Sequence, residues 1–246
     1  DLVQQGQPLV RFNSIQLQAQ LDAAVGQWIS ARSQEARLTA ERVEAERIEW
    51  PADLLARSTD PRLKPTMALH ARLFETRRNE LRTRRQMVEH ELAALNGDLA
   101  GYNEIKRHQQ ARMAAQEQEL VSFRELLGKG FISRSRVHEG EVLLGELGVD
   151  FSTAVSNISR TQQAINENRL KLLQIAETFR SEVEAQLTQV NVEAASLIER
   201  IKSLEFEVAS ASVLAPIEGQ VMNVAIHTVG GVVPAGQRLM DIVPLQ

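Results

Sequence analysis

The most constraining feature of this sequence is a short phrase that occurs twice, once near each end of the chain. The first copy runs from Val3 to Phe12 and the second from Val233 to Ile242, with valine, glycine, glutamine, leucine and a closing apolar residue in register. Each copy combines a glycine turn with a short strand of alternating apolar and polar residues. Two half-motifs at opposite ends predict one small β domain, made of residues 1–13 and 211–246, that is split by a very large insertion.

The insertion has the composition of long helices rather than of a large compact core. Aromatic residues make up only 4% of the chain, and the 24% of charged residues are spread through its middle. Three helical segments are predicted, over 14–49, 66–127 and 135–210, because apolar residues recur at spacings of three and four as in a coiled coil. The clearest seam residues are Leu81, Val88, Leu92, Leu95, Leu99 and Tyr102, and later Phe151, Ile158, Ile165, Leu172 and Phe179.

Two breaks separate these helical segments. The first, over 50–65, contains three prolines, which remove backbone donors and disfavour helix just before themselves. The second, over 128–134, contains Gly128 and Gly130 and is predicted to be the tip of a helical hairpin. The first two segments laid end to end would overshoot the third, so the first segment is expected to run beside part of the hairpin.

The residues that usually carry catalysis or cofactor chemistry are absent or scattered. The chain has no cysteine and a formal net charge of −4, which argues against thiolate metal sites and against a nucleic-acid partner. Its five histidines include no pair at a helical metal-ligand spacing. The arginines at 77–78 and 84–85 alternate with glutamates, which favours a solvated helix surface. We therefore predict neither an enzyme nor a bound cofactor.

The split glycine-turn repeat is similar to biotinyl and lipoyl domains, which carry a cofactor on a lysine at a hairpin tip. The corresponding segment here, Val224 to Gly230, contains no lysine, so a swinging-arm carrier is ruled out. Gly6, Gly219 and Gly236 are the predicted turn glycines of this lipoyl-like domain. No apolar run is long enough for a transmembrane helix, and we expect the chain to be an excised, soluble portion of a longer protein.

A lipoyl half, a long coiled-coil hairpin and a returning half that begins with Ala215-Pro216-Ile217-Glu218-Gly219-Gln220-Val221 together resemble a bacterial membrane fusion protein. The three helical segments and the proline-rich break resemble the HlyD-like adaptors of type I secretion, and more narrowly the alkaline-protease-secretion adaptors of the AprE/PrtE kind. The resemblance implies the periplasmic portion of an adaptor anchored in the inner membrane of a Gram-negative bacterium. It also implies a homo-oligomeric ring, expected to be a hexamer, that joins an inner-membrane ABC transporter to a TolC-like outer-membrane channel for protein export.

Adaptors of this family carry an Arg-Leu-Ser pattern at the hairpin tip that contacts the channel protein. On this chain the serine falls on Ser133 and the leucine on Leu126, but the arginine position is Ser122. Arg124 lies about 200° further around the helix and cannot simply take its place. The expected partner-binding residues of the tip are Leu126, Leu127, Gly128, Phe131, Ile132 and Ser133.

Two other functions stay open from the sequence. One is an adaptor of a small-molecule efflux pump, which a two-segment hairpin without the break at 50–65 would favour. The other is a free-standing coiled-coil scaffold, whose seam would need no split β domain.

Overall fold

The computed structural model describes residues 2–226 and 228–244; Asp1, His227 and residues 245–246, which fall in the two predicted halves of the β domain, lie outside the described residues. The chain divides into two compact units. The β-containing unit comprises residues 1–72 and 185–246, and the hairpin unit comprises residues 73–184. Two long helices, α3 (Leu63–Gly128) and α4 (Arg134–Ser210), contribute to both units.

Strands from the two ends of the chain pair with one another in the β-containing unit. An antiparallel sheet has the order β1 (Leu2–Val3), β4 (Gly219–Met222), β5 (Asp241–Pro244). A second antiparallel pair joins β2 (Pro8–Arg11) to β3 (Ser212–Leu214). The prediction of a small β domain split by a helical insertion is therefore confirmed. The two copies of the repeat do not pair with each other, since the strand of the first copy joins β3 and that of the second joins β4.

The three predicted turn glycines have two different roles. Gly6 and Gly236 have φ angles of +82° and +80°, a region that glycine enters without steric cost. Gly219 was expected at a turn, and this expectation is wrong because the residue begins strand β4. A Cβ atom at Gly219 would lie 2.4 Å from the carbonyl oxygen of Val243 on β5, so glycine is needed there for close strand pairing.

The helical core of the β-containing unit is built from four helices. Helix α1 (Ile15–Arg42), the short α2 (Ala52–Leu55), the start of α3 and the end of α4 pack together. Their buried contact residues are Ala24, Val25, Trp28, Ile29, Leu54, Leu63, Ile201 and Leu204. Ala24 and Trp28 of α1 belong to the same core as Leu63 of α3 and Leu204 of α4, so the first helical segment runs beside both long helices as expected.

The first helical segment is shorter than the sequence predicted. It was expected to reach residue 49, but α1 ends at Arg42 because Glu44 turns into the left-handed region with φ of +49°. The amides of Glu44 and Ala45 donate to the carbonyls of Glu41 and Ala40, which is the hydrogen-bond pattern of a Schellman helix end. Glycine usually fills this left-handed position, so a glutamate there gave no signal in the sequence.

The proline-rich connection is also more ordered than predicted. It contains α2, which follows Pro51, and α3 begins at Leu63 instead of residue 66. Pro65 lies in the first turn of α3, where a missing backbone donor costs nothing. Arg62 ties the end of the connection to α1 by donating to the carbonyl of Asp22 at 2.7 Å, and its hydrogen bond to Asp60 lowers the pKa of that carboxyl to about 2.

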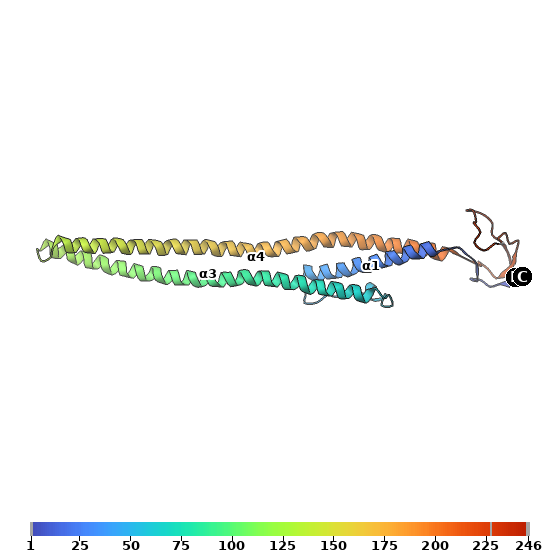
Figure 1. Cartoon of the computed structure of the whole chain (residues 1–246), viewed down its shortest axis with the longest axis horizontal. Helices are drawn as coiled ribbons and strands as arrows, with labels where there is room; N and C mark the ends of the chain where they lie inside the picture. The colour runs from blue at the N-terminus through green and yellow to red at the C-terminus, as the bar shows by residue number, and fades with distance from the viewer. Residues whose placement is uncertain (1, 227, 245–246) are drawn as a thin grey trace. The chain divides into compact units, whose positions relative to one another are not determined.

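In the hairpin unit, α3 and α4 run side by side in opposite directions (Figure 1). The predicted seam residues are buried or half-buried, and Leu81 and Ile165 are the buried ones. Leu120 and Ala154 are also buried in this unit. Three polar residues, Gln116, Thr161 and Asn168, are buried in the same seam. Across residues 2–226 and 228–244, no helix has an apolar stretch of the length that a bilayer span requires.

Candidate partner-binding site at the hairpin tip

The tip is a compact reversal between α3 and α4. The amides of Gly130 and Phe131 donate to the carbonyls of Leu127 and Leu126 at 3.0 Å each, and Gly130 has a φ of +80°. This is a second Schellman end, here with the glycine that the motif prefers. Of the two glycines that predicted the helix end, Gly130 has the left-handed backbone conformation and Gly128 does not.

Ser133 begins helix α4 as its N-terminal cap. Its hydroxyl oxygen accepts from the amide of Arg136 at 3.4 Å, and its carbonyl accepts from the same amide at 3.1 Å. The amide of Arg136 is thus shared between the carbonyl and the hydroxyl of Ser133, and serine is a preferred residue at the start of a helix. The side chain of Ser133 is exposed and can still meet a partner.

The predicted tip residues lie together around this turn, and several of them are exposed. Phe131 keeps 75% of its surface and Leu126 keeps 37%, while Leu127 and Ile132 are half-buried. Gly128 and Ser133 are exposed on either side of the turn. Large apolar side chains in a solvated turn mark a contact surface more often than a requirement of the fold. The group therefore has the character of a small apolar contact patch.

The tip patch rests on tightly packed residues one turn below it. Leu120 on α3 is 2% exposed and Val137 on α4 is 7% exposed. A Cβ atom at Gly140 would lie 2.9 Å from Cδ2 of Leu120, so this glycine allows the two helices to approach closely. The patch thus lies next to a closely packed end of the coiled coil.

The arginine of the family's tip pattern has no counterpart in the expected place. Ser122, at the arginine position, donates its hydroxyl to the carbonyl of Gln118 at 3.3 Å and remains a helix-surface residue. Arg124 donates to Glu141 across the hairpin at 2.8 Å, which joins α3 to α4 below the tip. Arg124 therefore has a partner within the chain.

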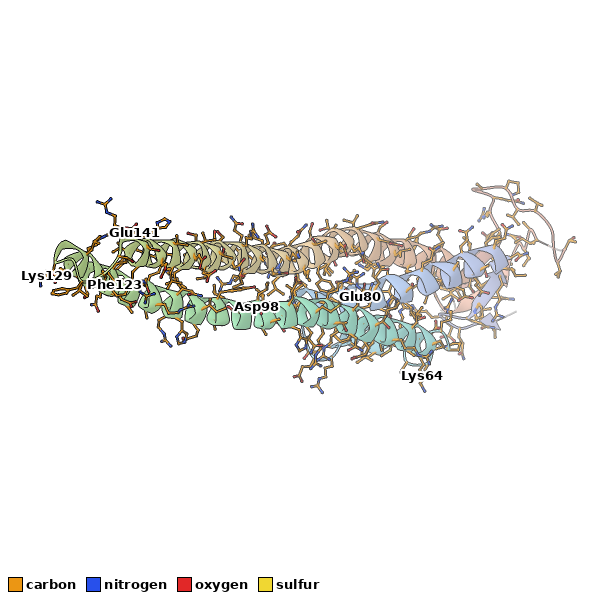
Figure 2. All side chains as sticks on the ribbon, turned by 60° about the vertical axis from the view of Figure 1, so that its left-hand side comes forward. Lys64, Glu80, Asp98, Phe123, Lys129 and Glu141 are labelled. Carbon is orange, nitrogen blue, oxygen red and sulfur yellow. The ribbon has the colours of Figure 1, made fainter. Side chains whose placement is uncertain are left out.

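Basic residues next to the apolar patch were missed by the sequence reasoning. Figure 2 shows Lys129 at the turn, with Phe123 on α3 and Glu141 on α4 behind it. Lys129 and Arg134 form no ion pair with another described residue. Arg136 places its guanidinium 5.1 Å from the centre of the Phe123 ring. The sequence could have indicated them, because Lys129 lies within the glycine turn and Arg134 and Arg136 follow it directly.

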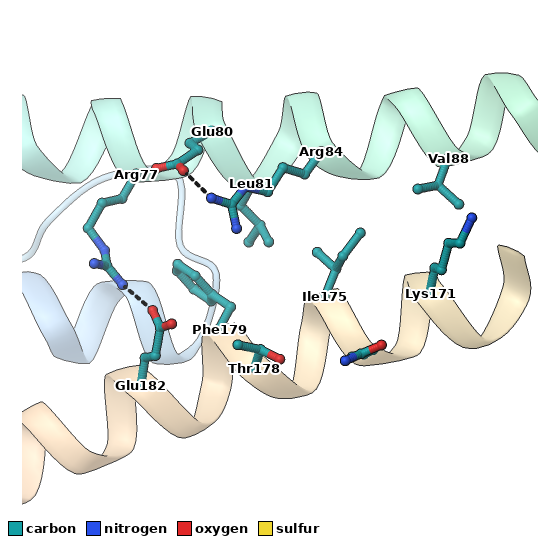
Figure 3. Close-up of a pocket in the computed structure, with 11 residues that line it drawn as sticks. Arg77, Glu80, Leu81, Arg84, Val88, Lys171, Ile175, Thr178, Phe179 and Glu182 are labelled. Carbon is teal, nitrogen blue, oxygen red and sulfur yellow. Dashed lines mark hydrogen bonds and ion pairs between the residues drawn. The ribbon is translucent and has the colours of Figure 1, made fainter.

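A second feature of the hairpin unit is a groove of about 500 Å³ between α3 and α4 (Figure 3). Its apolar residues are Leu81, Val88, Ile175 and Phe179. Arg77 pairs with Glu182 at 3.6 Å, and its guanidinium lies 5.4 Å from the centre of the Phe179 ring. Arg84 pairs with Glu80, one turn away on the same helix, at 2.5 Å. Arg77 and Arg84 in the groove therefore pair with carboxylates, as expected for a solvated coiled-coil surface, and Lys171 donates to the side-chain oxygen of Asn168 at 3.2 Å.

Across the part of the chain that the structure describes, no three histidine, aspartate or glutamate side chains lie close enough to hold a metal ion. The exposed apolar patch at the hairpin tip is the candidate functional surface.

Comparison with known proteins identifies the hairpin. The profile of a family described as "AprE, long alpha-helical hairpin" matches residues 17–207, which is most of the chain. A crystal structure of the soluble domain of LipC, a membrane fusion protein of a type I secretion system, superposes with a TM-score of 0.92 at 27% identity. The superposition covers 100% of this chain and 92% of the LipC chain.

Curated relatives of this chain are named as secretion proteins. The alkaline protease secretion protein AprE of Pseudomonas aeruginosa is 29% identical over 98% of this chain. The type I secretion system membrane fusion protein PrsE of Rhizobium meliloti is 27% identical over 99% of this chain. The chain spans about half the length of these relatives, 56% in each case.

The split β domain and the long helical hairpin are the architecture of a membrane fusion protein, as the superposition on LipC shows. The profile match covers well over half of the residues, including α1 and both hairpin helices. The chain belongs to the AprE long alpha-helical hairpin family, which confirms the resemblance seen in the sequence.

Proposed function

We propose that this chain is the hairpin and lipoyl-like part of a periplasmic adaptor in a tripartite type I secretion machine. The adaptor links an inner-membrane ABC transporter to a TolC-like outer-membrane channel and serves protein export. The observation that carries the proposal is the family membership of a hairpin whose tip leaves Leu126 and Phe131 exposed. The names of AprE, PrsE and LipC support the type I secretion branch.

The tip patch is the surface that we propose for the channel. Leu126, Phe131 and Ile132 supply apolar contact, and Ser133 supplies a hydroxyl beside them. Each tip offers few groups, so one copy would bind weakly. A homo-oligomeric ring, of six copies in our proposal, would present many tips together and bind through multivalency. The lysine and arginine beside the patch would favour an acidic rim on the channel protein.

The two alternative functions have less support. The periplasmic adaptor EmrA superposes over 99% of this chain with a TM-score of 0.56, but at 18% identity it indicates the fold alone. A free-standing scaffold would not require strands from opposite ends of the chain to pair, as β1 and β4 do.

The proposal is tested by secretion from cells that carry the full-length adaptor with a changed tip. Leu126→Asp should abolish secretion, because it places a charge in the contact patch and leaves the helix interior unchanged. Leu143→Asp on α4 is the matched control, since Leu143 is 40% exposed and Leu126 is 37% exposed. The control variant should secrete normally.

A test of Ser133 requires a variant that still caps the N-terminus of α4. Ser133→Arg should abolish secretion, but it would also remove the N-terminal cap of α4 at a cost of about 0.5–2 kcal/mol. Ser133→Asp keeps a good capping oxygen and changes the charge of the surface. Full secretion by Leu126→Asp and Ser133→Asp, at unchanged protein levels, would refute docking through the tip. Loss of the folded protein in both variants would mean instead that these residues only close the coiled coil.

A further inference from the structure

A small cluster of polar side chains is buried inside the β-containing unit. Among the residues that the structure describes, the buried polar residues of this unit are Ser33, Arg37 and Glu41 on α1 and His70 on α3. Arg37 and His70 are each 6% exposed, and Glu41 is 3% exposed. Charged groups are rarely buried this completely without a compensating partner.

The charges on α1 compensate each other. Arg37 Nη1 donates to Oε1 of Glu41, one turn along the helix, at 2.5 Å. Ser33 donates its hydroxyl to the carbonyl of Ile29 at 2.7 Å. The buried guanidinium of Arg37 therefore pairs with the Glu41 carboxylate through Nη1, while its Nε atom has no hydrogen-bond partner among the described residues.

His70 lies on α3 in this environment and has no compensating partner for its Nδ1 atom. That atom is buried without a hydrogen bond to any described residue. Burial and then the positive charge of Arg37 lower the pKa of His70 below its ordinary value of 6.5. Arg37 is the charged group that acts on it, and the buried residues of α2 and α4 in this unit are all apolar. They are Leu54, Leu187, Val190, Ala194, Ile201 and Leu204.

We propose that His70 is an acid-sensitive switch in the helical packing of this unit, and that its protonation loosens α1 from α3. Glu41 already neutralises Arg37 in this buried site, so a protonated imidazole would add a positive charge with no carboxylate of its own. The Nδ1 atom of His70 has no hydrogen-bond partner among the described residues to offset that charge. The resulting strain is relieved when the helices separate and water reaches the ring. This property goes beyond the proposed adaptor function and does not depend on it.

The sign of the pH dependence follows from linkage. Because the folded pKa of His70 is depressed, the unfolded state binds more protons than the folded state below pH 6.5. The contribution of neutral His70 to the free energy of unfolding is thus fully present above pH 6.5. It is lost as the pH falls from 6.5 towards the pKa that His70 has in the folded state. One extra proton bound on unfolding raises the unfolding equilibrium constant up to about tenfold for each pH unit.

The test is the pH dependence of unfolding of this chain, followed by tryptophan fluorescence. Both tryptophans, Trp28 and Trp50, belong to or pack against the core of the β-containing unit, so the signal reports on that unit. Between pH 6.5 and 5.5 the unfolding constant of the parent should rise more steeply than that of His70→Gln, by up to about tenfold per unit. His108→Gln, the same change at an exposed histidine, should retain the parental slope.

A second measurement does not depend on the variant folding. Nuclear magnetic resonance of histidine-labelled parent protein gives the protonation midpoint of His70 directly. A midpoint below those of the exposed histidines, together with faster amide exchange in the second half of α1 as the ring protonates, supports the proposal. A midpoint at or above 6.5, or identical pH slopes for the parent and His70→Gln, would overturn it.

Discussion

The short helix α2 offers the sharpest test of how the β-containing unit is held together. Leu54 has no exposed surface and belongs to the core formed with α1, α3 and α4, while its neighbour Leu55 is 46% exposed. Arg32 on α1 also holds the segment, because its Nε donates to Asp53 at 3.0 Å. The connection is therefore a docked element whose main apolar anchor is a single leucine.

Leu54→Ala should strongly destabilise this unit. The change removes three carbon atoms from the core, which at about 0.8 kcal/mol per buried methylene corresponds to about 2.4 kcal/mol of lost transfer free energy. The cavity adds to this loss, because a docked four-residue helix cannot collapse fully into the space. We expect the free energy of unfolding to fall by about 3 kcal/mol, within the range of about 2–5 kcal/mol typical of such changes.

Leu55→Ala is the matched control, since it makes the same chemical change at the adjacent position. It should cost less than about 1 kcal/mol, because the leucine already contacts water. Urea unfolding monitored by the fluorescence of Trp28 and Trp50 measures both variants. Equal losses from the two variants would refute the assignment of α2 as an anchor of the core.

Other predictions concern the strands and the hairpin. Gly236→Val should cost more than about 1 kcal/mol because of its positive φ, and a melting temperature equal to the parent's would contradict this. Gly219→Ala should open the β4–β5 pair, seen as faster amide exchange in both strands, because the new Cβ would meet a backbone oxygen. Leu204→Ala should destabilise by about 2–5 kcal/mol and Leu172→Ala by less, since Leu204 is buried whereas Leu172 is half-buried near the polar Asn168. Slower amide exchange around Leu172 than around Leu204 would contradict that order.

The candidate site was predictable in its location and less so in its detail. Glycines at 128 and 130 between two apolar periodicities located the tip, because a helix end needs a left-handed residue and the chain must reverse there. The cap that Ser133 forms on α4 is local, whereas the cross-hairpin pair of Arg124 with Glu141 depends on the position of α4 beside α3. Contacts between residues distant in sequence could not be found by reading one helix at a time.

The sequence by itself determined the architecture, because its signals are local and periodic. The duplicated phrase at Val3 and Val233 predicted the split β domain, and spacings of three and four predicted the paired helices. Proline and glycine located the breaks between the helical segments, since both residues change the allowed backbone angles directly.

Only the tertiary structure decided which residues give these elements their final form. The left-handed Glu44 ends α1 early, and Leu54 anchors a helix in a segment that reads as a loop. Gly219 was read as a turn, but a carbonyl on β5 requires it to be a glycine. His70 and Arg37 look like ordinary helix-surface residues in the sequence, and only the packing of α1 and α3 buries them. Burial depends on which helix faces lie together in space, and no local pattern encodes that information.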